Sequence, residues 1–258
     1  MSIGTERERR ITWWHRLPRS GPVERIAALV EAARDRRVVH AGFVDELMAS
    51  KQAQGIWLHA ELARVAKSLV GLDIDPAGVA AARAQGYEAH VVDCQSRGDV
   101  LALKLAPADI VIAGELLEHL DAPGPFLRAM KELAGEIVLT TPNAYRVANF
   151  FVPITGREAV HPDHTAWHSP QTLRRLLAMT GWEVSRITYY HNTVLRPLQG
   201  GRKSRIKTLL ANTARLGLRG ANGLLPYWSD GMIVWARRAK GPVVSGTPGA
   251  HPQVATAR

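Results

Sequence analysis

The stretch GLDIDP, at residues 71–76, decides the fold of this chain. Leu69 and Val70 lead into it, so an apolar strand ends in the acidic residue Asp73. A helix is predicted over 77–84, and an earlier strand over 37–42 enters a turn before a helical stretch over 55–67. Strand, turn, helix, strand and acid in this order predict half of a nucleotide-binding parallel sheet.

The acidic residue at the end of this strand has two possible roles. An ionised Asp73 at the carboxyl end of a strand can accept both hydrogen bonds of a ribose diol. Alternatively, it only caps the helix that begins at Pro76, but Asp75 is better placed for capping. We therefore expect Asp73 to bind a nucleotide ribose.

Two further motifs follow in order. Val91-Val92-Asp93-Cys94 ends a third strand, and the fourth strand, over 108–113, runs into GELLEHL at residues 114–120. With GLDIDP, these motifs resemble the class I S-adenosylmethionine-dependent methyltransferases, in particular the small-molecule branch that includes the ubiquinone-biosynthesis O-methyltransferases. The resemblance covers roughly residues 38–190.

This resemblance implies a Rossmann-like α/β fold. Its sheet would have seven mostly parallel strands with helices on both faces, and the last strand, over 230–238, would pair antiparallel with the strand over 181–190. The implied cofactor is S-adenosylmethionine and the implied reaction is methyl transfer to a small molecule, by analogy to a hydroxyl oxygen. Carried over by motif, the cofactor-binding residues are Gly42, Asp45, Asp73, Ile74, Asp93, Cys94 and Glu115.

The first loop departs from the family pattern. Where the family reads like V-L-D-V-G-C-G-D-G, residues 38–46 read VVHAGFVDE, so that only Gly42 remains and Val44 and Glu46 replace glycines. Glycine permits a positive φ and a close backbone approach, and a β-branched valine is poorly suited to such a turn. Asp45 or Glu46 could instead meet the cofactor's ammonium. Two alternatives stay open: a non-catalytic Rossmann-like protein that has lost the cofactor, and an NAD-dependent oxidoreductase, against which the missing GxGxxG turn argues.

A long loop over 143–169 is predicted after the fifth strand, and such loops are usually functional. In the family pattern, His164 lies above the acceptor side, so we predict that it accepts the acceptor's proton as a neutral imidazole, with His161 as the next candidate and His119 as the third. A metal site is also conceivable at four residues of this loop, His161, Asp163, His164 and His168. Their spacing fits no specific zinc pattern, so we expect no metal.

Composition and charge bound the rest. The 258 residues are 46% hydrophobic, carry a net charge of +10 and include the single cysteine Cys94. We expect an arm over 1–20, one domain over 21–239 with a basic insert at 196–228, and a disordered tail over 240–258. The charge predicts an anionic or lipid-associated acceptor, with contact to a membrane surface as an option; nucleic acid is disfavoured because aromatic residues are not interleaved with the cations. We expect a cytoplasmic protein. A helix over 22–36 either closes over the cofactor or packs only on the sheet.

Overall fold

The computed structural model describes residues 14–45, 48–191 and 225–240, together with residues 201, 208, 209, 213 and 217. Most of the predicted arm, most of the basic insert, the tail beyond residue 240 and Glu46 therefore lie outside the described residues. Within the described part, no helix combines the length and the apolar character needed to cross a membrane.

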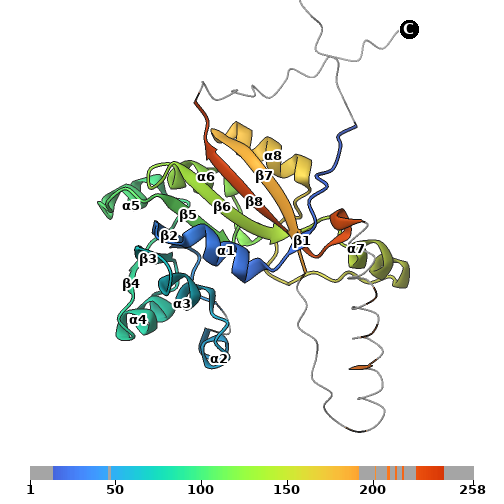
Figure 1. Ribbon diagram of the computed structural model, residues 1–258, viewed down its shortest axis with the longest axis horizontal. Coiled ribbons are helices and arrows are strands. Elements are labelled where there is room, and N and C mark those ends of the chain that lie inside the picture. The colour runs from blue at the N-terminus through green and yellow to red at the C-terminus, as the bar shows by residue number, and fades with distance from the viewer. Residues whose placement is uncertain are drawn as a thin grey trace, which may run out of the picture.

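An eight-stranded sheet forms the centre of the molecule (Figure 1). Its spatial order is β1-β7-β8-β6-β5-β2-β3-β4. Only β8 runs antiparallel, against both β6 and β7, as expected for the last strand. The strands are β1 (Pro22–Val23), β2 (Arg37–Ala41), β3 (Ser68–Asp73), β4 (Glu88–Val91), β5 (Ile110–Gly114), β6 (Glu136–Pro142), β7 (Trp182–Tyr190) and β8 (Gly231–Arg238).

The sequence predicted seven strands, and the additional strand is β1. Pro22–Val23 pairs with the end of β7, where the apolar pattern predicted the start of a helix. The helix α1 (Arg25–Ala33) begins later because the carboxylate of Glu24 accepts hydrogen bonds from the backbone amides of Ile26 and Ala27. Such an N-cap fixes the first turn and leaves the preceding residues extended.

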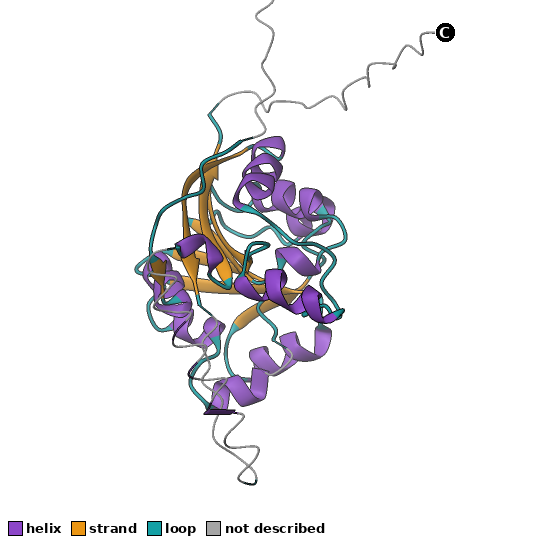
Figure 2. Ribbon diagram, turned by 90° about the vertical axis from the view of Figure 1, so that its right-hand side faces the viewer, coloured by secondary structure: helices purple, strands orange, loops and turns teal. Residues whose placement is uncertain are grey.

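Helices cover both faces of the sheet (Figure 2). Successive strand residues face opposite sides, so Val111 and Ala113 of β5 pack under α5 (Arg97–Ala102), α6 (Pro123–Met130) and α8 (Pro170–Met179). Ile110 and Ile112 pack on the other face with α1 and α3 (Leu58–Ala63). A third cluster joins α4 (Pro76–Ala84) to the loop after β2.

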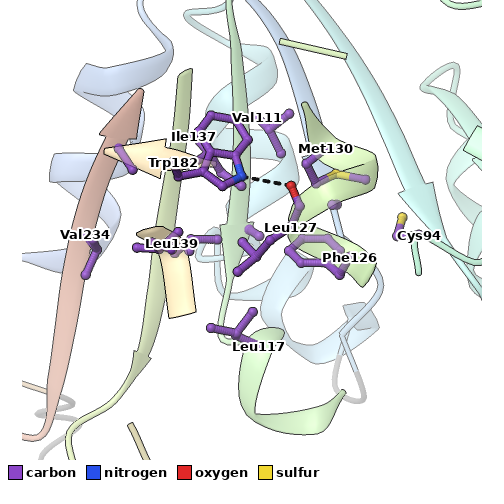
Figure 3. Close-up of a cluster of buried hydrophobic side chains, with 14 of the residues drawn as sticks. Cys94, Val111, Leu117, Phe126, Leu127, Met130, Ile137, Leu139, Trp182 and Val234 are labelled. Carbon is purple, nitrogen blue, oxygen red and sulfur yellow. Dashed lines mark hydrogen bonds between the residues drawn. The ribbon is translucent and has the colours of Figure 1, made fainter. Parts of the chain in front are cut away.

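The larger core contains a tryptophan whose polar atom is satisfied. Trp182, at the start of β7, is 1% exposed, and its indole N–H donates to the carbonyl of Leu127 in α6 at 2.8 Å (Figure 3). A buried indole needs such a partner, because an unpaired donor in the core costs free energy. The bond therefore fixes α6 against the sheet.

The segments after β2, β5 and β6 contain short helices, and those after β2 and β6 were not predicted from the sequence. The stretch after β2 includes α2 (Met48–Ala53), and the long loop after β6 includes α7 (Val147–Phe151) and the 3-10 helix η2 (Val152–Thr155). The segment GELLEHL after β5 contains the 3-10 turn η1 (Leu117–His119). The loop over 143–169 is thus not structureless, and this prediction was wrong.

Candidate functional site

A cavity of about 1190 Å³ opens at the carboxyl ends of the parallel strands. Its lining includes the residues that directly follow β2, β3, β4 and β5, which is where ligands bind in open α/β sheets. All nine cofactor-binding and catalytic residues predicted from the sequence line it, namely Gly42, Asp45, Asp73, Ile74, Asp93, Cys94, Glu115, His161 and His164. Further lining residues that sequence reasoning missed are Arg25, His40, Lys51, Trp57 and Arg146.

The two acids of GLDIDP have separate partners. Asp75 caps α4, since its carboxylate accepts from the amides of Ala77 and Gly78. Asp73 instead accepts from the amides of Val44 at 2.8 Å and Asp75 at 3.0 Å, and it lines the cavity while 9% exposed. Burial raises the pKa of Asp73 and these amide bonds oppose the rise. The capping role belongs to Asp75, and Asp73 has lone pairs left for a ligand.

The first loop accommodates valine without a glycine-like turn. Gly42 has φ +66°, and a Cβ there would lie 2.8 Å from the Leu116 side chain, so the one retained glycine is required. Val44 is not among the described residues with positive φ. Its side chain fills the space above Gly78, where a Cβ would lie 2.3 Å from Val44 Cγ1. The prediction that valine is poorly suited to position 44 was therefore wrong, because Gly78 on α4 leaves space for the Val44 side chain.

The acid expected to meet the ammonium already has a cationic partner. Lys51 of α2 forms a salt bridge with Asp45, and both side chains are partly exposed at the cavity wall. The pairing neutralises much of the charge that Asp45 offers to a ligand. Its distance along the chain is only six residues, but the sequence predicted no helix there and gave no reason to pair them.

The exits of β3 and β4 provide apolar and polar groups on the cavity wall. The Asp93 carboxylate accepts from the amide of Gln95 at 2.8 Å, so it stabilises its own turn as well as lining the cavity. Burial raises the pKa of the Cys94 thiol to about 12, which keeps it neutral. Ile74 is 68% exposed although apolar. A large exposed aliphatic side chain on a cavity wall offers a contact surface for a flat ring.

Glu115 is held in a strained conformation at the exit of β5. It has φ +54°, and its amide donates to the carbonyl and the hydroxyl of Thr140, each at 3.0 Å. The Tyr190 hydroxyl donates to one Glu115 oxygen, and Arg25 of α1 lies 5.8 Å from the Tyr190 ring centroid. Strain of this kind persists where surrounding contacts fix it and is common at functional sites.

The helix α1 contacts both the sheet and the cavity, and whether it closes over the cofactor stays a prediction. Leu29 and Ala33 pack on the sheet, and Arg25 reaches the cavity.

A buried histidine pair lies where the family pattern has an acid. Nδ1 of His40 in β2 is 3.1 Å from Nδ1 of His59 in α3, with the two rings stacked at 5.3 Å. Burial lowers the pKa of both, well below the ordinary value for His40 and to about 4 for His59, so the pair is neutral. The position of His40 beside Gly42 is a signal that sequence reasoning passed over.

Glu118 is a buried acid, and neither of its carboxyl oxygens has a hydrogen-bond partner among the described residues. It is 1% exposed and lines the cavity. Burial, reinforced by the charge of Glu115, raises its pKa to about 8, while the nearby Thr141 hydroxyl opposes the rise without hydrogen-bond geometry. An unpaired buried carboxyl group at a cavity wall has a strong electrostatic reason to meet a polar or cationic ligand.

Three histidines meet at the other end of the cavity. One candidate ligand atom from each of His119, His161 and His164 lies within 4.8 Å of the others. Burial first, and then the neighbouring His119 and His161, lower the pKa of His164, so its imidazole is neutral at pH 7. His168 does not join them: it is 7% exposed and does not line the cavity.

Asn143 and Ser169, at the two ends of the long loop after β6, have structural roles. Asn143 is fully buried and donates to the carbonyls of Tyr227 and Ser229, which ties the exit of β6 to the approach to β8. Ser169 and Thr172 form a capping box at the start of α8. Their side chains therefore serve packing and capping.

Comparisons with known proteins agree with this geometry. The sheet and its crevice define a Rossmann-like methyltransferase fold. A family described as a methyltransferase domain matches residues 53–187, slightly more than half of the chain, and the chain therefore belongs to the class I S-adenosylmethionine-dependent methyltransferases. S-adenosylmethionine is accordingly its cofactor. None of the curated proteins matches the chain.

Solved structures share the fold at low identity. A SAM-dependent methyltransferase from Archaeoglobus fulgidus has a TM-score of 0.51 and 16% identity, with coverage of 83% of this chain and 91% of that chain. Magnesium protoporphyrin IX methyltransferase from Synechocystis PCC 6803, solved with bound SAH, has a TM-score of 0.50 and 14% identity, with coverage of 83% and 82%. These similarities support the fold and leave the acceptor open.

Proposed function

We propose that this protein transfers the methyl group of S-adenosylmethionine to a hydroxyl oxygen of a small molecule. The observation that carries the proposal is one continuous cavity, with Asp73 at the end of β3 and the three histidines in the segments that follow β5 and β6. The first region suits a nucleoside and the second suits a proton-bearing acceptor. When bound, the cofactor supplies an electrophilic methyl group on a positively charged sulfur.

The residues present fit the cofactor. Asp73 would accept the ribose hydroxyls with the lone pairs that the two amides leave unused. Ile74 would pack on the adenine, whose polar edge Asp93 and the backbone at Cys94 would meet. Gly42 would allow the backbone to approach the cofactor closely. Since Lys51 occupies Asp45, we assign the ammonium to Glu115, which Tyr190 orients through one of its oxygens.

On the acceptor side, we propose His164 as the proton acceptor and His161 as its closest competitor. A neutral imidazole can take a hydroxyl proton, and the lowered pKa of His164 keeps it neutral at pH 7. Positioning supplies much of the rate of such a displacement, so the walls around the acceptor matter as much as the base. Trp167 and Arg146 form one wall, with the guanidinium 4.8 Å from the indole centroid.

An anionic or lipid-associated acceptor is part of the proposal. The chain carries a net charge of +10, and beside the cavity residues Ala148 and Ala159 the side chains of Phe150, Phe151 and Ile154 are exposed. Flotation with anionic and neutral vesicles tests membrane contact, and absence from both rules it out. The comparisons do not support the exclusion of nucleic acid, so an RNA oligonucleotide belongs in the acceptor panel.

Two measurements test the function. Titration calorimetry with S-adenosylhomocysteine and NAD should show binding of the first alone; binding of NAD alone, or of neither, would favour the oxidoreductase or the non-catalytic alternative. Transfer of a labelled methyl group should then be screened over phenols, aliphatic alcohols, amines and RNA. With the acceptor found, His164→Ala should lower turnover by about 10²–10⁴, the usual contribution of a general base, and leave S-adenosylhomocysteine affinity unchanged.

A further inference from the structure

The acceptor end of the cavity contains a cluster made from two distant parts of the chain. His119 belongs to η1 after β5, whereas His161 and His164 belong to the loop after β6. The ring centroids of His119 and His164 are 4.6 Å apart, and those of His119 and His161 are 5.7 Å apart. Three imidazoles therefore converge on one point although more than forty residues separate the first from the others.

Backbone contacts hold the two segments together. Thr165 donates through its amide to the carbonyl of Glu118 at 2.8 Å, and its hydroxyl contacts the carbonyls of Glu118 at 3.0 Å and Leu120 at 2.7 Å. The amide of His164 donates to the carbonyl of His161 at 3.1 Å, which closes the turn that carries both histidines. The cluster is thus built on fixed backbone, as a binding site requires.

We infer that His119, His161 and His164 bind one Zn²⁺ ion at the acceptor end of the cavity. The inference rests on the geometry and the donor type: imidazole nitrogens suit zinc and similar transition metals, whereas Mg²⁺ and Ca²⁺ prefer oxygen ligands. Tetrahedral zinc–nitrogen bonds of about 2.0–2.1 Å place neighbouring nitrogens about 3.3 Å apart. One candidate nitrogen from each histidine already lies within 4.8 Å of the others, so rotation of the side chains on this backbone would bring them to the ion.

Other features of the cluster agree with metal binding. Nδ1 of His164 is buried and has no hydrogen-bond partner among the described residues. Nδ1 of His161 accepts a hydrogen bond from the amide of Asp163 at 3.3 Å, so the turn that carries the cluster also positions this ring. All three histidines line the cavity, so a fourth coordination position would face the acceptor. Three protein ligands with an open position are typical of catalytic rather than structural zinc sites.

This site deepens the proposed function and rests on it for its role. At its open coordination position, the ion would bind an oxygen lone pair of the acceptor hydroxyl. This would lower the pKa of the hydroxyl, so that its proton leaves to solvent. His164 would then act as a ligand instead of as the base. The sequence expectation of no metal, based on spacing along the chain, did not include His119, which only the fold brings to the cluster.

The test measures the ion and not the reaction. Full-length protein is freed of metal with a chelator and dialysed. It is then titrated with Co²⁺, whose visible absorption bands indicate tetrahedral coordination, and afterwards with Zn²⁺ in competition. We expect one saturable site for each ion. Replacement of His119, His161 or His164 by alanine should each weaken Zn²⁺ binding at least about tenfold. The matched control is His15→Ala, which removes an exposed histidine outside the cavity and should change nothing.

Circular dichroism and thermal unfolding establish that each variant is folded, and Thr165→Val serves as a second route. It keeps all three imidazoles but removes the hydroxyl contacts with η1, so it should weaken Zn²⁺ less than loss of a ligand does. No saturable site, or a site unaffected by all three alanine replacements in folded protein, overturns the inference. Calorimetry with S-adenosylhomocysteine on the same samples separates the two proposals, because cofactor binding without metal binding refutes only the metal site.

Discussion

Replacement of Asp73 and of Asp75 by alanine provides a matched pair of variants. Each carboxylate accepts hydrogen bonds from two backbone amides, but Asp73 lines the cavity and Asp75 caps α4. If Asp73 also accepts the ribose hydroxyls, Asp73→Ala removes hydrogen bonds to a charged group, each worth about 1.5–3 kcal/mol. Loss of one such contribution corresponds to roughly a 10- to 150-fold weaker S-adenosylhomocysteine affinity.

The stability of the two variants should be similar. Loss of a helix cap costs about 0.5–2 kcal/mol, and unpairing the amides of Val44 and Asp75 costs about 1–3 kcal/mol. Urea unfolding measures this cost, and titration calorimetry with S-adenosylhomocysteine measures affinity on the same samples. Asp73→Asn, which preserves volume, is the second variant in case alanine prevents folding. Equal affinity of wild type and both Asp73 variants, or an equal loss in Asp75→Ala, would refute the ribose assignment.

Three further predictions concern stability. The pKa of Glu118 is raised from 4.5 to about 8 in the folded chain, so the stability that its protonated form provides is fully present below pH 4.5 and is lost as pH rises to about 8. Urea unfolding should show a loss of at most about 1.4 kcal/mol per pH unit in this range, and the loss should be smaller in Glu118→Gln. Identical pH profiles of wild type and variant would contradict the prediction. Gly78→Ala should cost about 1–3 kcal/mol through overpacking against Val44, and the double variant with Val44→Gly should recover part of that loss in thermal unfolding; strictly additive losses would show that the two side chains do not meet. Asn143→Ala should cost about 2–4 kcal/mol because it unpairs the partly buried carbonyl of Tyr227 and the buried carbonyl of Ser229, and an unchanged urea midpoint would rule out the cross-link between β6 and the approach to β8.

Local patterns in the chain predicted the framework well. Apolar runs that end in an acid gave β3 and β4, and the stop at Pro76 after Asp75 gave the start of α4. These features follow from short-range physics, because strand alternation, caps and proline act within a few residues. The order of motifs then identified the family and its cofactor, as the family match confirms.

Contacts between distant segments decided what the first loop tolerates. The effect of Val44 depends on Gly78, thirty-four positions later, and on the φ angle that the loop adopts once Asp73 holds its amide. A pattern of glycines along the chain contains neither fact. The same is true of Asp45, whose partner Lys51 comes from a helix that the sequence did not predict.

The sequence by itself determined which residues follow each strand and hence which side chains stand at the edge of the sheet. Only the tertiary structure decided which of them meet, because adjacency in a parallel sheet depends on strand order and not on chain order: β5 lies between β2 and β6, so His119 after β5 comes beside His161 and His164 after β6. Burial, too, is a property of the whole packing, and it is the largest cause of the raised pKa of Glu118 and of the lowered pKa of His164.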